Sequence, residues 1–371
     1  MERRVTPDVA AALWTPLVEH GSRWCARNIH ADVGWLDVDG VRWPIAVTRT
    51  LPRNCYVVSA TGQYLDYALE ETRRLPAGVV RRGSVLGLRC LAPALRRLDP
   101  IVVLDALPVS TVLHQRRTPD EWRHAVDTAR AQFRGAPIVI RSLDAVHTPE
   151  LLDHALTLGM SLLTSRLVFH QDPRHDAFWS IRNVRNDIRL ERESPMLSRT
   201  LHPADATDIA ALYWQLYGEK HSTLNPDFSP SWLAYGMAAG ALTGEGLVHD
   251  GRLVAAYLSY TVNDVMTNPV FGYDTTFPQA LGLYRRLSLL TMQCARRRAL
   301  RIHASSGAPG FKASRGGVAT VEYHAVDLRT VRGTQLAAWQ LTRRIAAMIG
   351  PRMLAHATLC RWRRPADTGT L

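Results

Sequence analysis

The chain has 371 residues, of which 46% are apolar and 21% charged, and its formal net charge is +12. This length suits two domains, and the composition is that of a globular protein and not of a disordered chain. The longest apolar runs, such as 151–168, are interrupted by polar residues before about 18 positions, so no membrane-spanning segment is predicted. The N-terminus lacks a continuous apolar stretch and a small-residue cleavage site, so no signal peptide is predicted and a cytoplasmic protein is expected. The five cysteines are scattered and form no CxxC pair, which supports neither a disulfide framework nor a zinc cluster.

The first half predicts a hairpin followed by alternating strands and helices. Asp39-Gly40 indicates the hairpin turn, and Thr118 followed by Pro119 indicates a helix start. The expected elements are a helix at 8–26, strands at 33–38 and 41–47, a helix at 64–74, a strand at 101–104, a helix at 118–133, a strand at 137–141, a helix from 148 and a strand at 161–169.

A polar segment at 171–176 marks a boundary, and an arginine-rich helix is expected at 177–192. Beyond it the second half predicts helices from 203 and 229, strands at 245–249, 252–262 and 266–275, a long amphipathic helix at 280–298, a strand at 301–304, a glycine-rich turn with a short helix at 307–317, a strand at 318–328 and a helix at 334–349. The predicted organisation is an N-terminal domain, a linker helix, a C-terminal domain and a loose tail, at 1–176, 177–194, 195–360 and 361–371.

The positive charge is carried almost entirely by arginine, because Lys220 and Lys312 are the only lysines among 45 basic residues. The charge favours a phosphate-rich partner, either nucleic acid or a nucleotide-bearing cofactor. A GC-rich genome that encodes arginine wherever a positive charge is needed would explain it equally well. The scarcity of lysine makes the position of each one informative.

The order of elements in the second half is similar to that of the Gcn5-related N-acyltransferase (GNAT) fold. The resemblance implies that the loop into the long helix presents backbone N–H groups to the pyrophosphate of coenzyme A, in a pattern of Gln or Arg, two residues, Gly, one residue, then Gly or Ala. Here that loop is Gln279-Ala280-Leu281-Gly282-Leu283-Tyr284, which departs from the pattern at Tyr284. A helix N-terminus offers unpaired donors to phosphate whatever the family, and Gly282 permits close approach. Gln279 and 281–284 are therefore predicted to bind the donor, with a plain helix start after Pro278 as the alternative.

The segment 303–317 and the strand after it resemble the closing segment of the Fem-type branch, in which a Phe-Lys pair and a later glycine lie between two strands. The pair here is Phe311-Lys312. Fem-type enzymes carry two GNAT-like halves, the first often degenerate. The resemblance therefore implies an α/β (α+β) fold of two GNAT-like mixed sheets flanked by helices, with a degenerate N-terminal one.

Acyl transfer needs a base, a polarised carbonyl and a proton for the leaving group. Asp274, at a strand end beside the donor loop, and His303 are predicted as bases, although a strand-end Asp can cap the next turn and a strand His can be structural. Lys312 is predicted to protonate the leaving group or to hold an anionic acceptor or an oxyanion, with a surface lysine as the alternative. Weaker base candidates are Glu219, His221 and Asp264, and the predicted acceptor-binding residues are Tyr273, Ser305, Ser306 and Arg315.

No metal site is predicted, because His170, His175 and Asp176 lack a third matched ligand, and no tightly bound cofactor is expected. The chain has no GxSxG, Walker or HExxH motif. The predicted function is an N-acyltransferase that moves an acyl group from acyl-CoA or acyl carrier protein to an amine of a small metabolite or lipid precursor, by direct attack in a ternary complex. The alternatives are a Fem-like aminoacyl-tRNA-dependent transferase, in which tRNA is the partner, and a non-enzymatic nucleic-acid binder.

Overall fold

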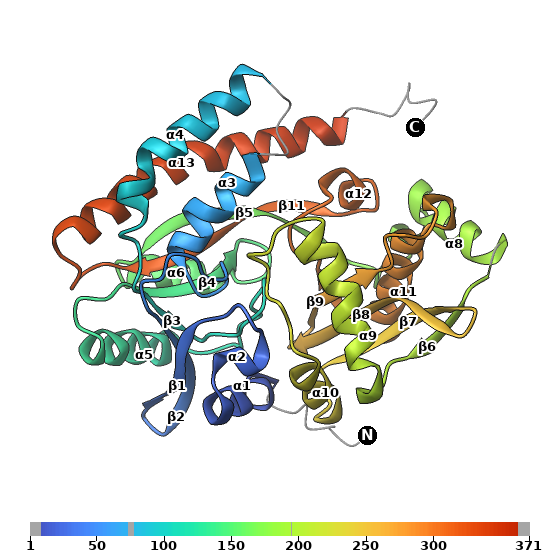
Figure 1. Ribbon diagram of the computed structural model, residues 1–371, viewed down its shortest axis with the longest axis horizontal. Coiled ribbons are helices and arrows are strands. Elements are labelled where there is room, and N and C mark those ends of the chain that lie inside the picture. The colour runs from blue at the N-terminus through green and yellow to red at the C-terminus, as the bar shows by residue number, and fades with distance from the viewer. Residues whose placement is uncertain (1–8, 73–77, 194, 363–371) are drawn as a thin grey trace.

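The structure, a computed structural model, describes residues 9–72, 78–193 and 195–362, with side chains as far as 348. Its strands form one mixed sheet in the order β1-β2-β3-β4-β11-β5-β10-β9-β8-β7-β6 (Figure 1). The strands are β1 (Ala31–Val38), β2 (Val41–Thr48), β3 (Val102–Leu104), β4 (Ile138–Asp144), β5 (Ser161–Gln171), β6 (Leu197–Thr200), β7 (Thr243–His249), β8 (Arg252–Val262), β9 (Val265–Tyr273), β10 (Arg301–His303) and β11 (Val318–Asp327).

Helices cover both faces of this sheet. The α-helices are α1 (Val9–His20), α2 (Ser22–Cys25), α3 (Ala68–Glu71), α4 (Val79–Leu95), α5 (Pro119–Gln132), α6 (Pro149–Thr157), α7 (Asp176–Trp179), α8 (Arg182–Glu193), α9 (Ala206–Trp214), α10 (Pro230–Ala238), α11 (Leu283–Arg297), α12 (Pro309–Ala313) and α13 (Gly333–Trp362). Within the described residues there are also short turns of π-helix, η1 (Gly62–Tyr67) and η4 (Gln215–Glu219), and of 3₁₀-helix, η3 (Pro203–Asp205) and η5 (Gln279–Leu281). None of the helices in the described ranges is long and apolar enough to cross a membrane.

The local signals of the sequence act as predicted. Asp39 and Gly40, at φ 50° and 80°, turn the hairpin between β1 and β2, in which Val38 pairs with Val41. The Thr118 hydroxyl accepts the backbone N–H of Glu121, while the Glu121 carboxylate accepts that of Thr118, which starts α5 as a capping box. The mixed α/β class is confirmed, and the two predicted sheets are continuous with one another.

The continuity comes from an exchange of the last strand of each half. β5, the last strand of the first half, pairs antiparallel with β10, so that His170 faces His303. β11, the last strand of the second half, pairs antiparallel with β4, so that Glu322 faces Asp144. Residues of both halves therefore meet at the centre of the sheet, and the predicted limits of the two domains stay a prediction.

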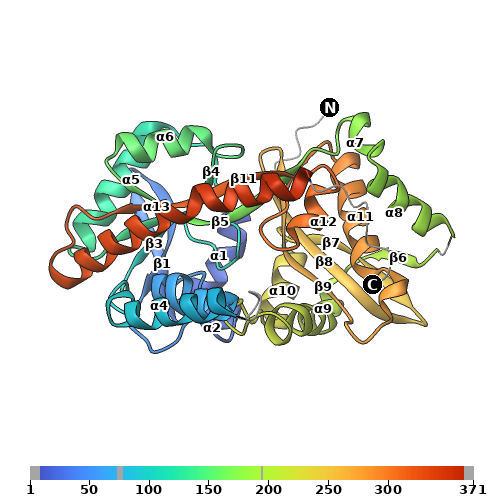
Figure 2. The same ribbon diagram turned by 90° about the horizontal axis from the view of Figure 1, so that it is seen from above.

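Alternate side chains of β8 show how the helices cover the sheet. Ala256 and Leu258 belong to a core shared with α1, α9, α10 and α13, whereas Ala255 and Tyr257 belong to a core shared with α11. Since neighbouring side chains of a strand point to opposite faces, α9 and α11 lie on opposite sides of the sheet. In Figure 2, α13 runs across both halves of the molecule.

The sequence predicted no element where α4 lies. Gly83, Gly87 and Pro93 lower the helix propensity of this segment, and Leu88 and Leu91 hold it by packing against the core. The last helix, α13, extends well beyond the predicted end at 349. The predicted tail, 361–371, lies outside the described residues after position 362.

Candidate active site

The sheet is open on one side of β9. β10 pairs with β9 over three residues only, from Arg301 with Val265 to His303 with Thr267. From Val270 to Tyr273 the strand has a partner on β8 but none on the β10 side among the described residues. Unpaired backbone groups along such an edge can bind an extended ligand.

One end of this opening leads to the start of α11. The turn η5 is followed by Gly282 at φ 65° and then by Leu283, the first residue of the helix. The N-cap residue is Gly282, which has no side chain to cap the helix, so within the described ranges the N–H groups of the first turn are available to a phosphate. Of the predicted donor residues, Gln279 is exposed, Leu281, Gly282 and Tyr284 are partly exposed, and Leu283 is buried. These residues lie together because they are almost consecutive in the sequence. Donor binding by them stays a prediction.

Gly282 is needed here for two reasons that involve no ligand. Its left-handed backbone strains any residue with a side chain. In addition, a Cβ at this position would lie 2.8 Å from Cδ2 of Leu190 on α8. The glycine in the sequence motif is therefore accounted for by its backbone conformation and by packing, and it does not by itself indicate a donor site.

Ion pairs from α8 hold the start of α11. The buried guanidinium of Arg286 donates to Glu191 at 2.9 Å and to the carbonyl groups of Leu281 at 2.9 Å and Leu190 at 3.2 Å. Arg285 donates from Nε to Oδ1 of Asp187 at 2.6 Å. The helix start is therefore fixed before any ligand binds.

The Phe-Lys pair packs against this start. The ring of Phe311 on α12 contacts that of Tyr284, with centroids 4.6 Å apart, and Tyr284 also contacts Phe271 and Tyr273. Arg315 stacks on Phe311 at 3.6 Å, and Asp187 holds its guanidinium. The structure thus brings Tyr273, Tyr284 and Phe311-Lys312 together at the opening.

The ammonium of Lys312 is held by the chain that follows β10. Nζ donates to the carbonyl groups of Ala304 at 2.5 Å, Ser305 at 3.3 Å and Ser306 at 2.6 Å. These acceptors favour the charged form, whereas burial, and after it the positive charge of Arg166, lower the pKa of Lys312 to about 7. Lys312 can therefore exchange a proton near neutral pH.

The other predicted bases are occupied by local contacts. Asp274 accepts from the N–H of Thr276 at 3.0 Å and from its hydroxyl at 2.6 Å. Although burial raises its pKa, these bonds and the nearby Arg252 hold the pKa of Asp274 below the usual value. Asp264 pairs with Arg301 at 3.0 Å, and Glu219 and His221 are exposed beyond α9. Asp274 lies seven residues beyond Thr267, about 23 Å along β9, and so it is not brought together with His303.

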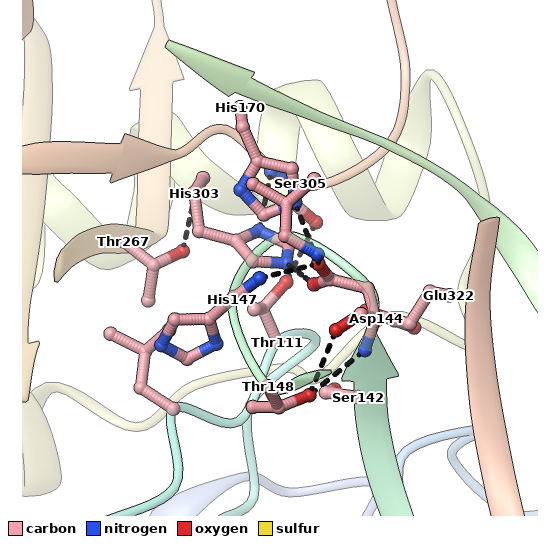
Figure 3. Close-up of polar contacts among 12 residues, drawn as sticks. Thr111, Ser142, Asp144, His147, Thr148, His170, Thr267, His303, Ser305 and Glu322 are labelled. Carbon is pink, nitrogen blue, oxygen red and sulfur yellow. Dashed lines mark hydrogen bonds and ion pairs between the residues drawn. The ribbon is translucent and has the colours of Figure 1, made fainter. Parts of the chain in front are cut away.

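His303 is buried at the junction of the two halves. Its Nε2 lies 3.4 Å from Oδ2 of Asp144, whose Oδ1 lies 3.1 Å from Nε2 of His170. Figure 3 shows the Asp144 carboxylate beside both rings, which contact one another with their centroids 4.6 Å apart. Burial raises the pKa of Asp144, but His170 and His303 more than compensate and hold it well below its usual range. Burial lowers the pKa of His303, so its ring is neutral at pH 7.

These three residues have the spacing of a metal-binding set, since their ligand atoms lie within 4.8 Å of one another. Oδ2 of Asp144 and Nε2 of both histidines have no hydrogen-bond partner within the described part of the chain. However, Nδ1 of His303 accepts the N–H of Ser305 at 3.1 Å, so the neutral ring carries its hydrogen on Nε2. A metal needs a lone pair at that atom. The set therefore fits a carboxylate paired with two imidazole rings better than it fits a metal centre.

Several residues of this region were not found from the sequence: Asp144, Asp187, Thr111, and the buried pair of Arg166 and Glu322, whose Nε and Oε1 are 2.8 Å apart. Asp144 follows a predicted strand, so an acid at a strand end was visible. Its place beside His303 depends on the strand exchange, for which the sequence carries no local signal.

No family model matches the chain, and no curated protein matches it in sequence. Three solved structures have similar folds over nearly the whole chain. The C-terminal domain of a putative lysylphosphatidylglycerol synthetase from Agrobacterium fabrum has 12% identity and a TM-score of 0.52 and covers 92% of both chains. L-PGS from Bacillus licheniformis has 11% identity, a TM-score of 0.51 and coverage of 92% of this chain and 97% of that one. FemX has 10% identity, a TM-score of 0.50 and coverage of 92% and 99%. The chain therefore shares its overall fold with these three proteins, as the resemblance to Fem-type enzymes predicted, and identities this low establish the fold alone.

Proposed function

We propose that this chain is a transferase that moves an acyl group from a thioester donor, either acyl-CoA or acyl carrier protein, to an amine of a small metabolite or lipid precursor by direct attack in a ternary complex. The observation that carries the proposal is the opening between β9 and β10, which has the uncapped start of α11 at one end and Lys312 beside it. A phosphate-bearing donor can place its phosphates on the helix start and extend its arm along the free edge of β9.

The chemistry assigned to Lys312 is proton donation. The neutral amine attacks the thioester carbonyl, a C–N bond forms and the C–S bond breaks, and the amine loses a proton to a base, for which Asp274 and His303 remain the predicted residues. The ammonium of Lys312 then gives a proton to the leaving thiolate. The transfer is favourable, because the pKa of Lys312 is about 7 and that of a thiol is about 8.5. The product thiol leaves, and Lys312 takes up a proton from water.

A second candidate donor is aminoacyl-tRNA. Two observations favour it. The similarity to FemX and to L-PGS covers both halves of this chain, and the net charge of the chain is +12. With that donor the leaving group is a ribose hydroxyl. Lys312 would then donate its proton to an alkoxide, and the start of α11 would face the RNA backbone.

Thermal unfolding of the full chain with each donor separates these alternatives. A ligand at 100 times its Kd raises the free energy of unfolding by about 2.7 kcal/mol. We expect acyl-CoA or acyl carrier protein to raise the melting temperature, and aminoacyl-tRNA not to. Stabilisation by aminoacyl-tRNA alone would replace the thioester donor with the second candidate, and no stabilisation by any of the three would overturn both.

A further inference from the structure

We infer that Asp144 is a positioning residue for Lys312: it holds His303, His303 holds the turn 304–306, and the carbonyl groups of that turn hold Nζ of Lys312. The inference deepens the proposed function and rests on it in taking Lys312 as the reacting group. In this arrangement Asp144 and His303 both act through the backbone of the turn, so His303 is a positioning residue, and of the two predicted bases Asp274 is left to accept the proton of the amine.

The first link joins the two halves. Asp144 is the last residue of β4 and is fully buried. Its Oδ1 accepts the N–H groups of Val146 and His147, both at 2.8 Å, which fixes the carboxylate. Its Oδ2 is left facing Nε2 of His303 at 3.4 Å (Figure 3). The fixed carboxylate therefore places its negatively charged Oδ2 beside Nε2 of the His303 ring.

The second link runs through the His303 ring. Nδ1 accepts the N–H of Ser305 at 3.1 Å, so the hydrogen of the neutral ring is on Nε2, the atom that faces Asp144. If Asp144 lost its charge, nothing in this contact would favour that tautomer over the other one. The other tautomer has a hydrogen on Nδ1, which would oppose the N–H of Ser305.

The third link is the turn itself. Ser305 has φ 56°, a left-handed conformation that a residue with a side chain adopts only when its surroundings hold it. It is held by His303, by the N–H of Phe169, which donates to its carbonyl at 3.1 Å, and by the hydroxyl of Thr111, which donates to its Oγ at 2.9 Å. The same turn supplies all three carbonyl groups that accept from Nζ of Lys312.

Three of the groups that fix this turn, Asp144, Thr111 and Phe169, come from the first half of the chain. The strand exchange brings them there, because β4 and β5 lie on either side of β11 and β5 lies beside β10. The first half therefore shapes the surroundings of Lys312 without offering a catalytic group of its own. Among the described residues, Nζ also lies near the cationic Arg166 and 5.9 Å from the ring centroid of Phe169.

The test observes Lys312 directly. Lysine labelled with ¹³C at Cε should give two NMR signals, one from Lys312 and one from the exposed Lys220, which serves as an internal control. In Asp144→Asn the turn loosens and Nζ reaches water, so the measured pKa of Lys312 should rise by at least about half a unit toward the 10.4 of a free lysine. His303→Gln breaks the same chain of contacts at the next link and should produce the same shift, which covers the case in which Asp144→Asn fails to fold.

A matched control is Asp327→Asn. Asp327 is a buried carboxylate held by Arg329 and Arg130, and it pairs with Ile138 at the opposite end of β4, about 20 Å from Asp144 along the strand. It should leave the Lys312 signal unchanged. In Asp144→Asn, kcat should fall at least about tenfold while the KM for the donor stays within about twofold, because the start of α11 is untouched.

An unchanged Lys312 signal in folded Asp144→Asn and His303→Gln would overturn the inference. The inference would also be overturned if the wild-type protein bound one equivalent of a transition metal and Asp144→Asn did not. Asp144, His170 and His303 would then form a metal site. If the Lys312 signal shifts as expected but Lys312→Met keeps full activity, the positioning holds and the proposed function fails.

Discussion

Asp187 and Arg315 form a buried bidentate ion pair, with Nε to Oδ2 at 2.5 Å and Nη2 to Oδ1 at 3.0 Å. The same carboxylate also accepts from Arg285 at the start of α11. Asp187 on α8 therefore joins two parts of the predicted site. It fixes the start of α11, which is predicted to bind the donor, relative to the segment that carries Lys312. The guanidinium of Arg315, predicted to bind the acceptor, is thus engaged by the protein itself, and acceptor binding by it stays a prediction.

Asp187→Asn should destabilise the protein by about 3 kcal/mol, because it leaves buried arginine charge without its counter-charge. The free energy of unfolding measured with urea checks this. The matched control is Asp176→Asn, which breaks the pair with Arg296, where Asp176 is 90% exposed, and should change stability little. Equal effects of the two substitutions would show that the buried pair has no special role in stability.

Gln279→Glu should raise the KM for a phosphate-bearing donor about tenfold, because it places a negative charge beside the phosphates at the start of α11. The same charge is favourable for the helix, by about 0.3–1 kcal/mol at its N-terminus. Stability and donor affinity should therefore change in opposite directions, which no folding defect would produce. Gln279→Lys is the control and should lower the KM. A KM unaffected by either charge would place the donor phosphates elsewhere.

The sequence predicted those features of the fold and the site that depend on residues close together in the chain. The hairpin turn at Asp39-Gly40 and the helix start at Thr118 depend on residues a few positions apart, and both were predictable. The Phe-Lys pair and the predicted donor loop were proposed in the same way, from short motifs, and their roles stay predictions. Asp144 could not be assigned, because its contact with His303 spans about 160 residues and exists only through the exchange of β5 and β11. Gly282 shows a different limit: its φ and the nearby Leu190 already favour glycine, so the motif glycine alone does not establish a ligand-binding role, and that role stays a prediction.

Lys312→Met should lower kcat/KM by at least about 10²-fold with folding intact, which is the scale of a lost general acid. Lys312→Arg should restore little if a proton is donated, because arginine holds its proton too tightly, and much if only a positive charge is needed. Steady-state kinetics of both variants decide this, with Lys220→Met as the matched lysine control, since Lys220 is exposed. Near-full activity in Lys312→Met would make the Phe-Lys pair structural.

Stability should rise with pH between about 7 and 10.4 because of Lys312. Burial lowers its pKa in the folded chain to about 7, whereas the unfolded chain keeps the value of a free lysine, about 10.4. In this window the unfolded chain binds one proton more than the folded chain, so the free energy of unfolding rises by up to about 1.4 kcal/mol per pH unit. Below pH 7 both states are protonated, and the slope from this group vanishes. Urea unfolding at pH 7, 8 and 9 should show the rise in the wild-type protein and a smaller one in Lys312→Met, which lacks the titrating amine. Parallel pH dependences in the two proteins would mean that Lys312 keeps an ordinary pKa, and its assignment as the acid for the leaving thiolate would lose its basis.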